Sequence, residues 1–261
     1  MKYILIPIRG LYFLYAAIIF VALMLLVVPV VIVASFFGKI RGGNIIYKAC
    51  QCWTDIWFFF IGIRHRNIHE EPHDKKQQYI FVANHISYMD IPVIVKTVRQ
   101  PLRILGKSEM GKVPVFGFIY RNAAVTVDRS SAENRAKSVR ILKSVIRRGI
   151  SIFIFPEGTF NESHEPLRSF YDGAFRIAIE TQTPIKPLLF LDTYARQHYK
   201  SVLTLNPGKS RSIFLTPVPV EGLTQKDLPA LKEKVFRIME EGLRKYNAEW
   251  IDDVPQQTAH D

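Results

Sequence analysis

Cysteine is nearly absent from this sequence: only Cys50 and Cys52 occur among 261 residues. Side chains two positions apart on a helix diverge, which disfavours a disulfide between these two. No neighbouring side chains complete a metal-binding set around them, so a metal site is disfavoured as well. We therefore expect two reduced thiols in a reducing compartment, and no bound metal.

Acidic residues are also scarce. The chain has 23 Asp and Glu against 35 Lys and Arg, which gives a formal net charge of +12. This surplus indicates an anionic partner, which can be nucleic acid, an acidic membrane surface, or a phosphate-bearing substrate or carrier. The sequence has no internal repeat and no low-complexity linker, and 48% of its residues are apolar. We therefore expect one folded core rather than a disordered chain.

Charge is missing altogether from residues 11–37. This run is long enough to span a bilayer, and it offers no convincing signal-peptide cleavage site, so we expect it to stay attached. Pro29 interrupts the run, which leaves two alternatives: one kinked spanning helix, or a bent segment that enters one leaflet and returns. The segment favours a membrane over nucleic acid as the anionic partner.

A second apolar stretch, residues 53–63, is too short to span, and its aromatic side chains suit the membrane interface. The alternative is that this stretch packs on the folded domain. Lysine and arginine flanks favour the cytoplasmic side and contact with anionic headgroups. We assign residues 1–66 to an N-terminal membrane-inserted helical segment. The flanking basic residues are Lys39, Arg41, Lys48, Arg64 and Arg66.

From residue 79 onwards, strand-like and helix-like segments alternate, which is typical of an α/β fold. We expect a mixed, largely parallel sheet flanked by helices over residues 67–250, followed by a polar tail over 251–261. Ser131 and Thr224 have the character of N-caps for the two long helices. The predicted strands are 79–83, 102–106, 123–127, 151–155, 185–191, 202–205 and 213–218, and the predicted helices are 91–98, 115–121, 132–148, 173–181 and 226–250.

The apolar run at 79–83 leads directly into Asn84-His85-Ile86-Ser87-Tyr88-Met89-Asp90. A histidine at a strand end, with an aspartate in the first turn of the next helix, can be oriented through one ring nitrogen while the other takes a proton. His85 and Asp90 are therefore candidates for a general base and its orienting residue. The alternative is an ordinary strand-end histidine beside a helix cap. His69 and Asp74 have the same spacing, but their charged, proline-containing segment is typical of a solvated linker.

Two further sets of polar residues follow predicted strands. Arg129 comes after the strand at 123–127, and Lys107 after the strand at 102–106. Open α/β sheets collect ligands at the carboxyl ends of strands, where an arginine can bind a phosphate through two parallel hydrogen bonds. A simple surface arginine is the alternative.

The third motif is Phe155-Pro156-Glu157-Gly158-Thr159, at the end of a strand that we expect to be buried on both faces. Proline ends the strand ladder and glycine lets backbone N–H groups approach a ligand closely. The result is a rigid turn with one carboxylate, and a purely structural turn is the alternative.

Four blocks in this order resemble the glycerolipid acyltransferases of the 1-acyl-sn-glycerol-3-phosphate acyltransferase type. The blocks are residues 84–90, then 107–129, then 155–159 with 170–174, and finally 184–187. The sequence departs from the family pattern at Tyr171 or Asp172, where lysine is usual, and at Lys186 in an otherwise apolar block.

The resemblance implies transfer of an acyl chain from a thioester, on coenzyme A or acyl carrier protein, to the free hydroxyl of a lysophospholipid at a membrane surface. The expected acceptor is 1-acylglycerol 3-phosphate, the product is phosphatidic acid, and no cofactor is required. His85 would be the base and Asp90 would fix its tautomer. The predicted substrate-binding set is Arg129, Glu157, Gly158, Thr159 and Lys107.

Rival functions remain open. Within enzymes, the acceptor can instead be glycerol 3-phosphate or the hydroxyl of a lyso-aminolipid. A non-catalytic membrane lipid carrier would share the apolar N-terminus, but it has no use for His85 and Asp90 at a strand end. A nucleic-acid binder explains only the charge.

Overall fold

A seven-stranded sheet forms the centre of the protein in a computed structural model that describes residues 2–127 and 132–251. The strand order is β1-β7-β6-β2-β5-β3-β4, and every neighbouring pair is parallel except β6 with β7. The predicted mixed, largely parallel sheet is confirmed. The strands are β1 (Ile63–His69), β2 (Ile80–Ala83), β3 (Leu102–Lys107), β4 (Ala124–Val127), β5 (Ser151–Ile154), β6 (Ile185–Phe190) and β7 (Gly208–Phe214).

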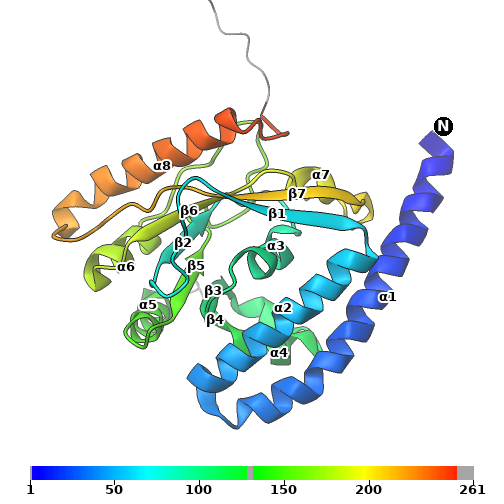
Figure 1. Ribbon diagram of the computed structural model, residues 1–261, viewed down its shortest axis with the longest axis horizontal. Coiled ribbons are helices and arrows are strands. Elements are labelled where there is room, and N and C mark those ends of the chain that lie inside the picture. The colour runs from blue at the N-terminus through cyan, green and yellow to red at the C-terminus, as the bar shows by residue number, and fades with distance from the viewer. Residues whose placement is uncertain (1, 128–131, 252–261) are drawn as a thin grey trace, which may run out of the picture.

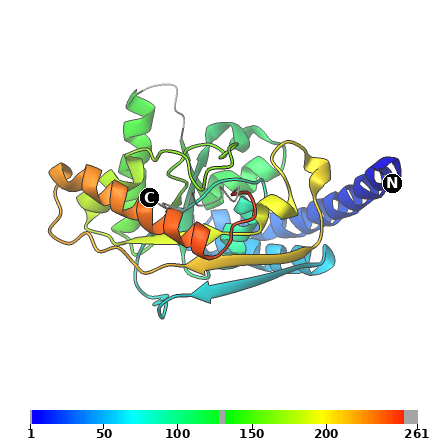
Figure 2. The same ribbon diagram turned by 90° about the horizontal axis from the view of Figure 1, so that it is seen from above.

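Helices cover both faces of this sheet (Figures 1 and 2). Alternate strand residues supply two separate cores: Ile80 and Val82 pack with α5, α6 and α8, whereas Phe81 and Ala83 pack with α1, α2 and α3. The helices are α1 (Lys2–Ser35), α2 (Gly43–Phe60), α3 (Asp90–Thr97), α4 (Phe116–Ala123), α5 (Ala132–Ile146), α6 (Gly173–Thr181), α7 (Thr193–Arg196) and α8 (Leu228–Lys245).

Strand β1 corrects the predicted end of the N-terminal segment. Residues 63–69 form the edge strand, pair with β7 in parallel, and cross residue 66, where we expected that segment to end. His69 is the last residue of this strand, whereas the charged segment 70–76 that follows it has no helix or strand and is mostly exposed, as predicted for a linker. The ring of His69 stacks on Phe214 with 4.3 Å between centroids. The strand was missed because polar residues dominate it. Some of them meet inside the protein, where the ring nitrogens of His65 contact Ser210 Oγ at 3.0 Å and Asn67 Oδ1 at 2.8 Å.

Two predictions near the C-terminal part of the sheet were also inaccurate. The predicted strand at 202–205 is a single 3-10 turn, Val202–Thr204, in which Val202 and Leu203 are exposed. Strand β7 begins earlier than predicted and ends at Phe214. Thr224 and Asp227 form a capping box at the 3-10 turn Gln225–Asp227, which leads directly into α8, so the predicted cap lies one turn before the long helix. Ser131 lies outside the described residues.

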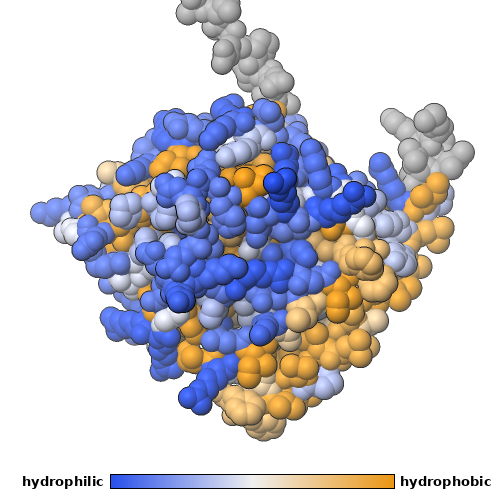
Figure 3. Space-filling model, in the orientation of Figure 1, coloured by the Kyte–Doolittle hydropathy of each residue, from blue (hydrophilic) through white to orange (hydrophobic). Residues whose placement is uncertain are grey.

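Helices α1 and α2 form an antiparallel hairpin joined by a π-helical turn, Gly38–Gly42. Helix α1 runs on through Pro7 and Pro29, and residues 7–35 are long and apolar enough to cross a membrane. One stripe of α1 is buried and consists of Ala16, Met24, Val27, Val31 and Ala34. The outward stripe is exposed and apolar, and it appears as the orange surface at the lower right of Figure 3. It includes Leu11, Leu14, Ile18, Leu25, Leu26 and Val33, and the exposed Phe36 and Phe37 follow directly after the helix.

The aromatic residues of α2 do not all face outwards as expected. Trp53 and Trp57 are each 7% exposed, and Phe20 of α1 packs against both rings. The indole N–H of Trp57 donates to the Ala16 carbonyl at 2.9 Å. The interface prediction is therefore wrong for the tryptophans, because they hold α1 and α2 together, while Phe59 and Phe60 are exposed.

A buried arginine fastens this hairpin to the sheet. Arg103 of β3 is 3% exposed, and its Nη2 donates to the carbonyls of Lys39 at 2.8 Å and Ile40 at 3.1 Å. Burial lowers the pKa of Arg103 to about 10. A side chain at Gly43 would place its Cβ 2.2 Å from the same guanidinium, so glycine is needed there. Hydrogen bonds from one guanidinium to two backbone carbonyls thus hold the hairpin turn against the sheet.

Lys186 of β6 is fully buried, and among the described residues its Nζ has no hydrogen-bond partner. The amine lies 5.9 Å from the centre of the Tyr79 ring, a weak substitute for hydration. Burial lowers the pKa of this lysine. The charged form is therefore disfavoured inside the protein.

We expect Lys186→Met to raise the free energy of unfolding by about 1–3 kcal/mol at pH 7, because the thioether fills similar space without an unpaired polar group. Urea or thermal unfolding of the purified variant measures this change. Lys209→Met, at an exposed position, serves as the control and should stay within about 0.5 kcal/mol of wild type. A variant less stable than wild type would show that the amine is well accommodated.

Candidate active site

The side chain of Asn84 continues the sheet beyond the end of β2. Its Oδ1 accepts from the Phe190 backbone N–H at 2.8 Å, and its Nδ2 donates to the Phe190 carbonyl at 3.0 Å. The side-chain amide thus takes the place of a backbone peptide group in the hydrogen-bond ladder between β2 and β6. His85 is consequently presented at the carboxyl edge of the parallel strands, where open α/β sheets bind ligands.

Asp90, the first residue of α3, gathers three donors on one oxygen. Its Oδ2 lies 2.8 Å from His85 Nδ1, 2.7 Å from the Ile86 backbone N and 2.9 Å from the Ser87 backbone N. The carboxylate is fully buried. When Nδ1 donates to it, Nε2 carries the lone pair, and within the described residues Nε2 makes no hydrogen bond. Because Asp90 bonds backwards to this loop, it is not a simple helix cap.

Two aromatic rings fix the plane of the imidazole. Phe155 stacks on His85 with 3.8 Å between ring centroids and 10° between planes. Phe160 meets the imidazole edge to face at 4.4 Å, and Tyr88 packs on Phe160 at 5.0 Å. The His85 side chain keeps 16% of its surface exposed. The histidine is therefore held rigidly yet remains accessible. The sequence analysis missed the role of Phe160, which no motif signalled.

Glu157 points into the protein. It is 2% exposed, and its two oxygens accept from the backbone N–H groups of His85 and Arg168, each at 2.8 Å. Burial raises the pKa of Glu157 to about 8, an effect that the two backbone donors oppose. The carboxylate thus ties the histidine loop to the segment that follows the turn. This placement favours a positioning role over the predicted contact with the glycerol phosphate.

The rest of the 155–161 turn supports the same histidine. Gly158 has φ 72°, a left-handed conformation that suits glycine, and Thr159 is exposed beside it. The Asn161 backbone N–H donates to the His85 carbonyl at 2.6 Å. Asn161 is itself buried, and its Nδ2 donates to the Glu165 carbonyl at 2.8 Å. The turn therefore hydrogen-bonds to both the backbone N–H and the backbone carbonyl of His85.

The predicted cationic residues are less closely placed. Lys107 is exposed at the end of β3, two strands from β2 in the sheet. Arg129 lies outside the described residues, so its role stays a prediction. Arg168, which the sequence did not single out, is exposed and donates from Nη1 to the Phe160 carbonyl at 3.3 Å. It is a cation close to the aromatic rings around His85.

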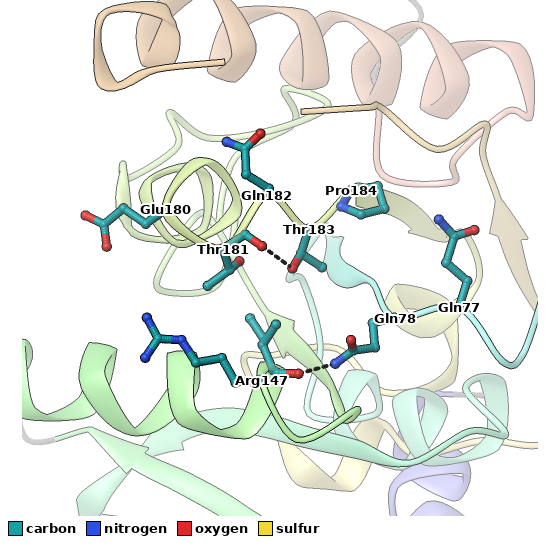
Figure 4. Close-up of a pocket in the computed structure, with 9 residues that line it drawn as sticks. Gln77, Gln78, Arg147, Glu180, Thr181, Gln182, Thr183 and Pro184 are labelled. Carbon is teal, nitrogen blue, oxygen red and sulfur yellow. Dashed lines mark hydrogen bonds between the residues drawn. The ribbon is translucent and has the colours of Figure 1, made fainter. Parts of the chain in front are cut away.

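A polar hollow of about 470 Å³ lies at the opposite edge of the sheet (Figure 4). Gln78 precedes β2 and Thr183 precedes β6, so these residues mark the amino ends of the strands. Their side chains already bond to backbone carbonyls of Ile146 and Thr181. The hollow therefore offers no counterpart to the histidine pair. No cluster of three potential metal ligands occurs in the part of the chain that the structure describes.

Comparison with known proteins agrees with this geometry. Residues 64–191 match the family model described as Acyltransferase. The chain is 28% identical over 185 residues to 1-acyl-sn-glycerol-3-phosphate acyltransferase alpha of Homo sapiens. The match covers 70% of this chain and 64% of the human protein, so it spans less than two thirds of the human protein's length. It is 26% identical over 181 residues to the lyso-ornithine lipid O-acyltransferase of Pseudomonas aeruginosa, covering 62% of this chain and 68% of that protein.

The fold also has a solved counterpart. The crystal structure of PlsC, the 1-acyl-sn-glycerophosphate acyltransferase from Thermotoga maritima, matches with a TM-score of 0.74 and 23% identity, over 97% of this chain and 100% of that one. At this identity the match shows a shared α/β fold. Residues 64–191 carry the acyltransferase domain that this family model describes.

We expect His85→Ala to lower kcat by about 10²- to 10⁴-fold, because the positioned base is lost. Thermal unfolding should change little, since this side chain is at the edge of the sheet. His69→Ala, which removes an exposed histidine of the same spacing pattern, is the matched control and should retain activity. Equal losses in the two variants would contradict the assignment of His85.

Glu157→Gln tests the positioning role against direct acceptor binding. The amide keeps one acceptor oxygen but cannot accept from both backbone groups, so His85 should shift. We expect kcat to fall about 10- to 100-fold, with the acceptor KM within about threefold of wild type. A selective rise in acceptor KM would instead assign Glu157 to the substrate.

The same variant has a pH signature. The pKa of Glu157 is raised from 4.5 to about 8 in the folded protein, so the folded state binds this proton more tightly than the unfolded chain does. The contribution of Glu157 to the free energy of unfolding therefore declines as the pH rises from 4.5 to about 8. Glu157→Gln cannot titrate and should show a flatter dependence of unfolding free energy on pH.

Proposed function

We propose that this protein transfers an acyl chain from coenzyme A or acyl carrier protein to the free hydroxyl of 1-acylglycerol 3-phosphate, giving phosphatidic acid. The observation that carries the proposal is the His85 Nδ1 to Asp90 Oδ2 contact of 2.8 Å at the carboxyl edge of the sheet, where Nε2 makes no hydrogen bond to any residue that the structure describes. The names of relatives support the acceptor class.

The chemistry needs one base and no enzyme nucleophile. His85 Nε2 takes the proton of the acceptor hydroxyl as its oxygen attacks the thioester carbonyl. The tetrahedral oxyanion then collapses, the carbon–sulfur bond breaks, and the imidazolium returns the proton to the departing thiolate. Asp90 keeps Nδ1 protonated before the reaction and stabilises the imidazolium during it. The carbon–oxygen bond that forms replaces the carbon–sulfur bond that breaks, and the proton passes from the hydroxyl to the thiolate, so no cofactor is needed.

Membrane association follows from the exposed apolar stripe of α1 (Figure 3). Helix α1 also contacts α2, α4 and the 3-10 turn at Val202–Thr204, so it lies along the α/β domain. This arrangement favours a hairpin embedded in one leaflet over a helix that crosses alone. Exposed Lys39 and Arg41 at its turn favour anionic headgroups and the cytoplasmic face.

A second acceptor class has its own support. The lyso-ornithine lipid O-acyltransferase of Pseudomonas aeruginosa is among the relatives, and in the described part of the chain the rings that contact His85 are those of Phe155 and Phe160. An acceptor without a phosphate would not need the arginine that we predict to bind the phosphate. Substitution of Arg129 therefore distinguishes the two acceptor classes.

We expect Arg129→Ala to lower kcat/KM for lysophosphatidic acid about 10- to 150-fold, the worth of one charge-assisted bidentate contact. Arg129→Lys should recover part of this loss, because lysine keeps the charge without the planar fork. With monoacylglycerol as acceptor, wild type and variant should converge. The measurement is the ratio of kcat/KM for the two acceptors, at a fixed acyl-CoA concentration.

Arg237→Ala, on the exposed side of α8, is the control for loss of positive charge and should leave the ratio unchanged. An unchanged ratio in Arg129→Ala would favour a phosphate-free acceptor such as a lyso-aminolipid. No transfer to any lysolipid by wild-type protein in detergent would refute the proposed function.

A further inference from the structure

Helix α5 separates apolar and cationic side chains. Leu142 and Ile146 are buried against the sheet, whereas Lys137 and Arg140 are exposed. At 3.6 residues per turn these two cations lie about 60° apart on the helix surface. We call Lys137 and Arg140 the α5 cationic face.

This face has no structural partner. Within residues 2–127 and 132–251, neither of its two cations forms an ion pair, whereas the neighbouring Lys143 pairs with Glu180 of α6. Ile141 is 42% exposed beside them. Unpaired charges around an exposed apolar side chain do little for the stability of the fold. They are suited to an anionic partner that brings its own apolar contact.

The position of α5 excludes the membrane as the simplest partner. Helix α5 packs on the sheet face opposite the α1–α2 hairpin (Figure 1). In Figure 3 the apolar surface follows α1 at the lower right, while the lower left, where α5 lies in Figure 1, is hydrophilic. A membrane bound through α1 therefore leaves the α5 cationic face turned towards solution.

The face is also close to the catalytic edge. Helix α5 begins at Ala132, five residues after β4 ends at Val127, at the same carboxyl edge of the sheet as His85. Three strand spacings separate β4 from β2, which is about 14 Å. A partner docked along α5 would need a flexible arm to bring its reactive group to His85.

We propose that the α5 cationic face docks an acidic acyl carrier protein, which delivers the acyl thioester to His85 on its extended prosthetic arm. Such a carrier supplies the negative surface, and its arm covers the distance between the docking site and the base. The proposal rests on the proposed function and adds the surface through which one of the two donor classes is recognised. Coenzyme A has no protein surface and should not depend on this face.

The test compares two donors in the full-length protein. We measure kcat/KM with an acyl carrier protein thioester and with the coenzyme A thioester of the same chain, using lysophosphatidic acid as acceptor. The variant is Lys137→Glu combined with Arg140→Glu. The control is Lys226→Glu combined with Lys234→Glu, two exposed lysines at and near the start of α8, which changes net charge equally.

At low ionic strength we expect the ratio of carrier to coenzyme A kcat/KM to fall at least about tenfold in the α5 variant, with the control within about twofold of wild type. Added salt should lower the wild-type rate with the carrier and remove most of the difference. An equal fall with both donors, an unchanged ratio, or failure of wild type to use the carrier while it uses coenzyme A would overturn the inference. Wild type that uses neither donor refutes the proposed function instead.

A membrane role for the same face has its own readout. Binding to vesicles of anionic phospholipid is measured for both double variants. Loss of vesicle binding in the α5 variant, with an unchanged donor ratio, assigns the face to lipid and overturns the carrier proposal. Retained vesicle binding together with a reduced donor ratio supports it.

Discussion

The site depends on a single buried oxygen. Asp90 Oδ2 accepts from the His85 ring and from the backbone of Ile86 and Ser87, so one carboxylate both orients the candidate base and shapes the loop that carries it. Fully removed from water, this oxygen has its donors supplied by protein alone. Orientation of the imidazole and shape of the loop cannot vary independently, because the same atom fixes both.

The sheet divides the molecule into two sides. Alternating strand residues send one set of side chains towards the apolar hairpin and the other towards helices α5, α6 and α8. The His85 loop after β2 and the turn after β5 meet at the edge between these sides. Glu157 and Asn161 join them through the backbone of His85. The candidate base therefore lies where the two sides of the molecule meet.

The elements that could be predicted from the sequence are those that depend on local residue patterns. Strands β2 to β6 are apolar runs, and the pairing of His85 with Asp90 follows from a strand end and a helix start five residues apart. Strand β1 escaped detection because its polar residues find partners, such as Ser210, that are distant in sequence. The inward direction of Glu157 was equally inaccessible, since it depends on the Arg168 backbone in an irregular segment. Contacts of this kind arise only once the chain has closed on itself.

The pairing of β1 with β7 also constrains how the chain is made. His65 and Ser210 are separated by 145 positions, so at roughly 5–20 residues per second the ribosome needs about 7–30 s to produce the partner of the edge strand. Throughout that interval β1 has no β7 with which to pair. Early contact of the apolar hairpin with a lipid surface would shield its exposed stripe before the sheet can close.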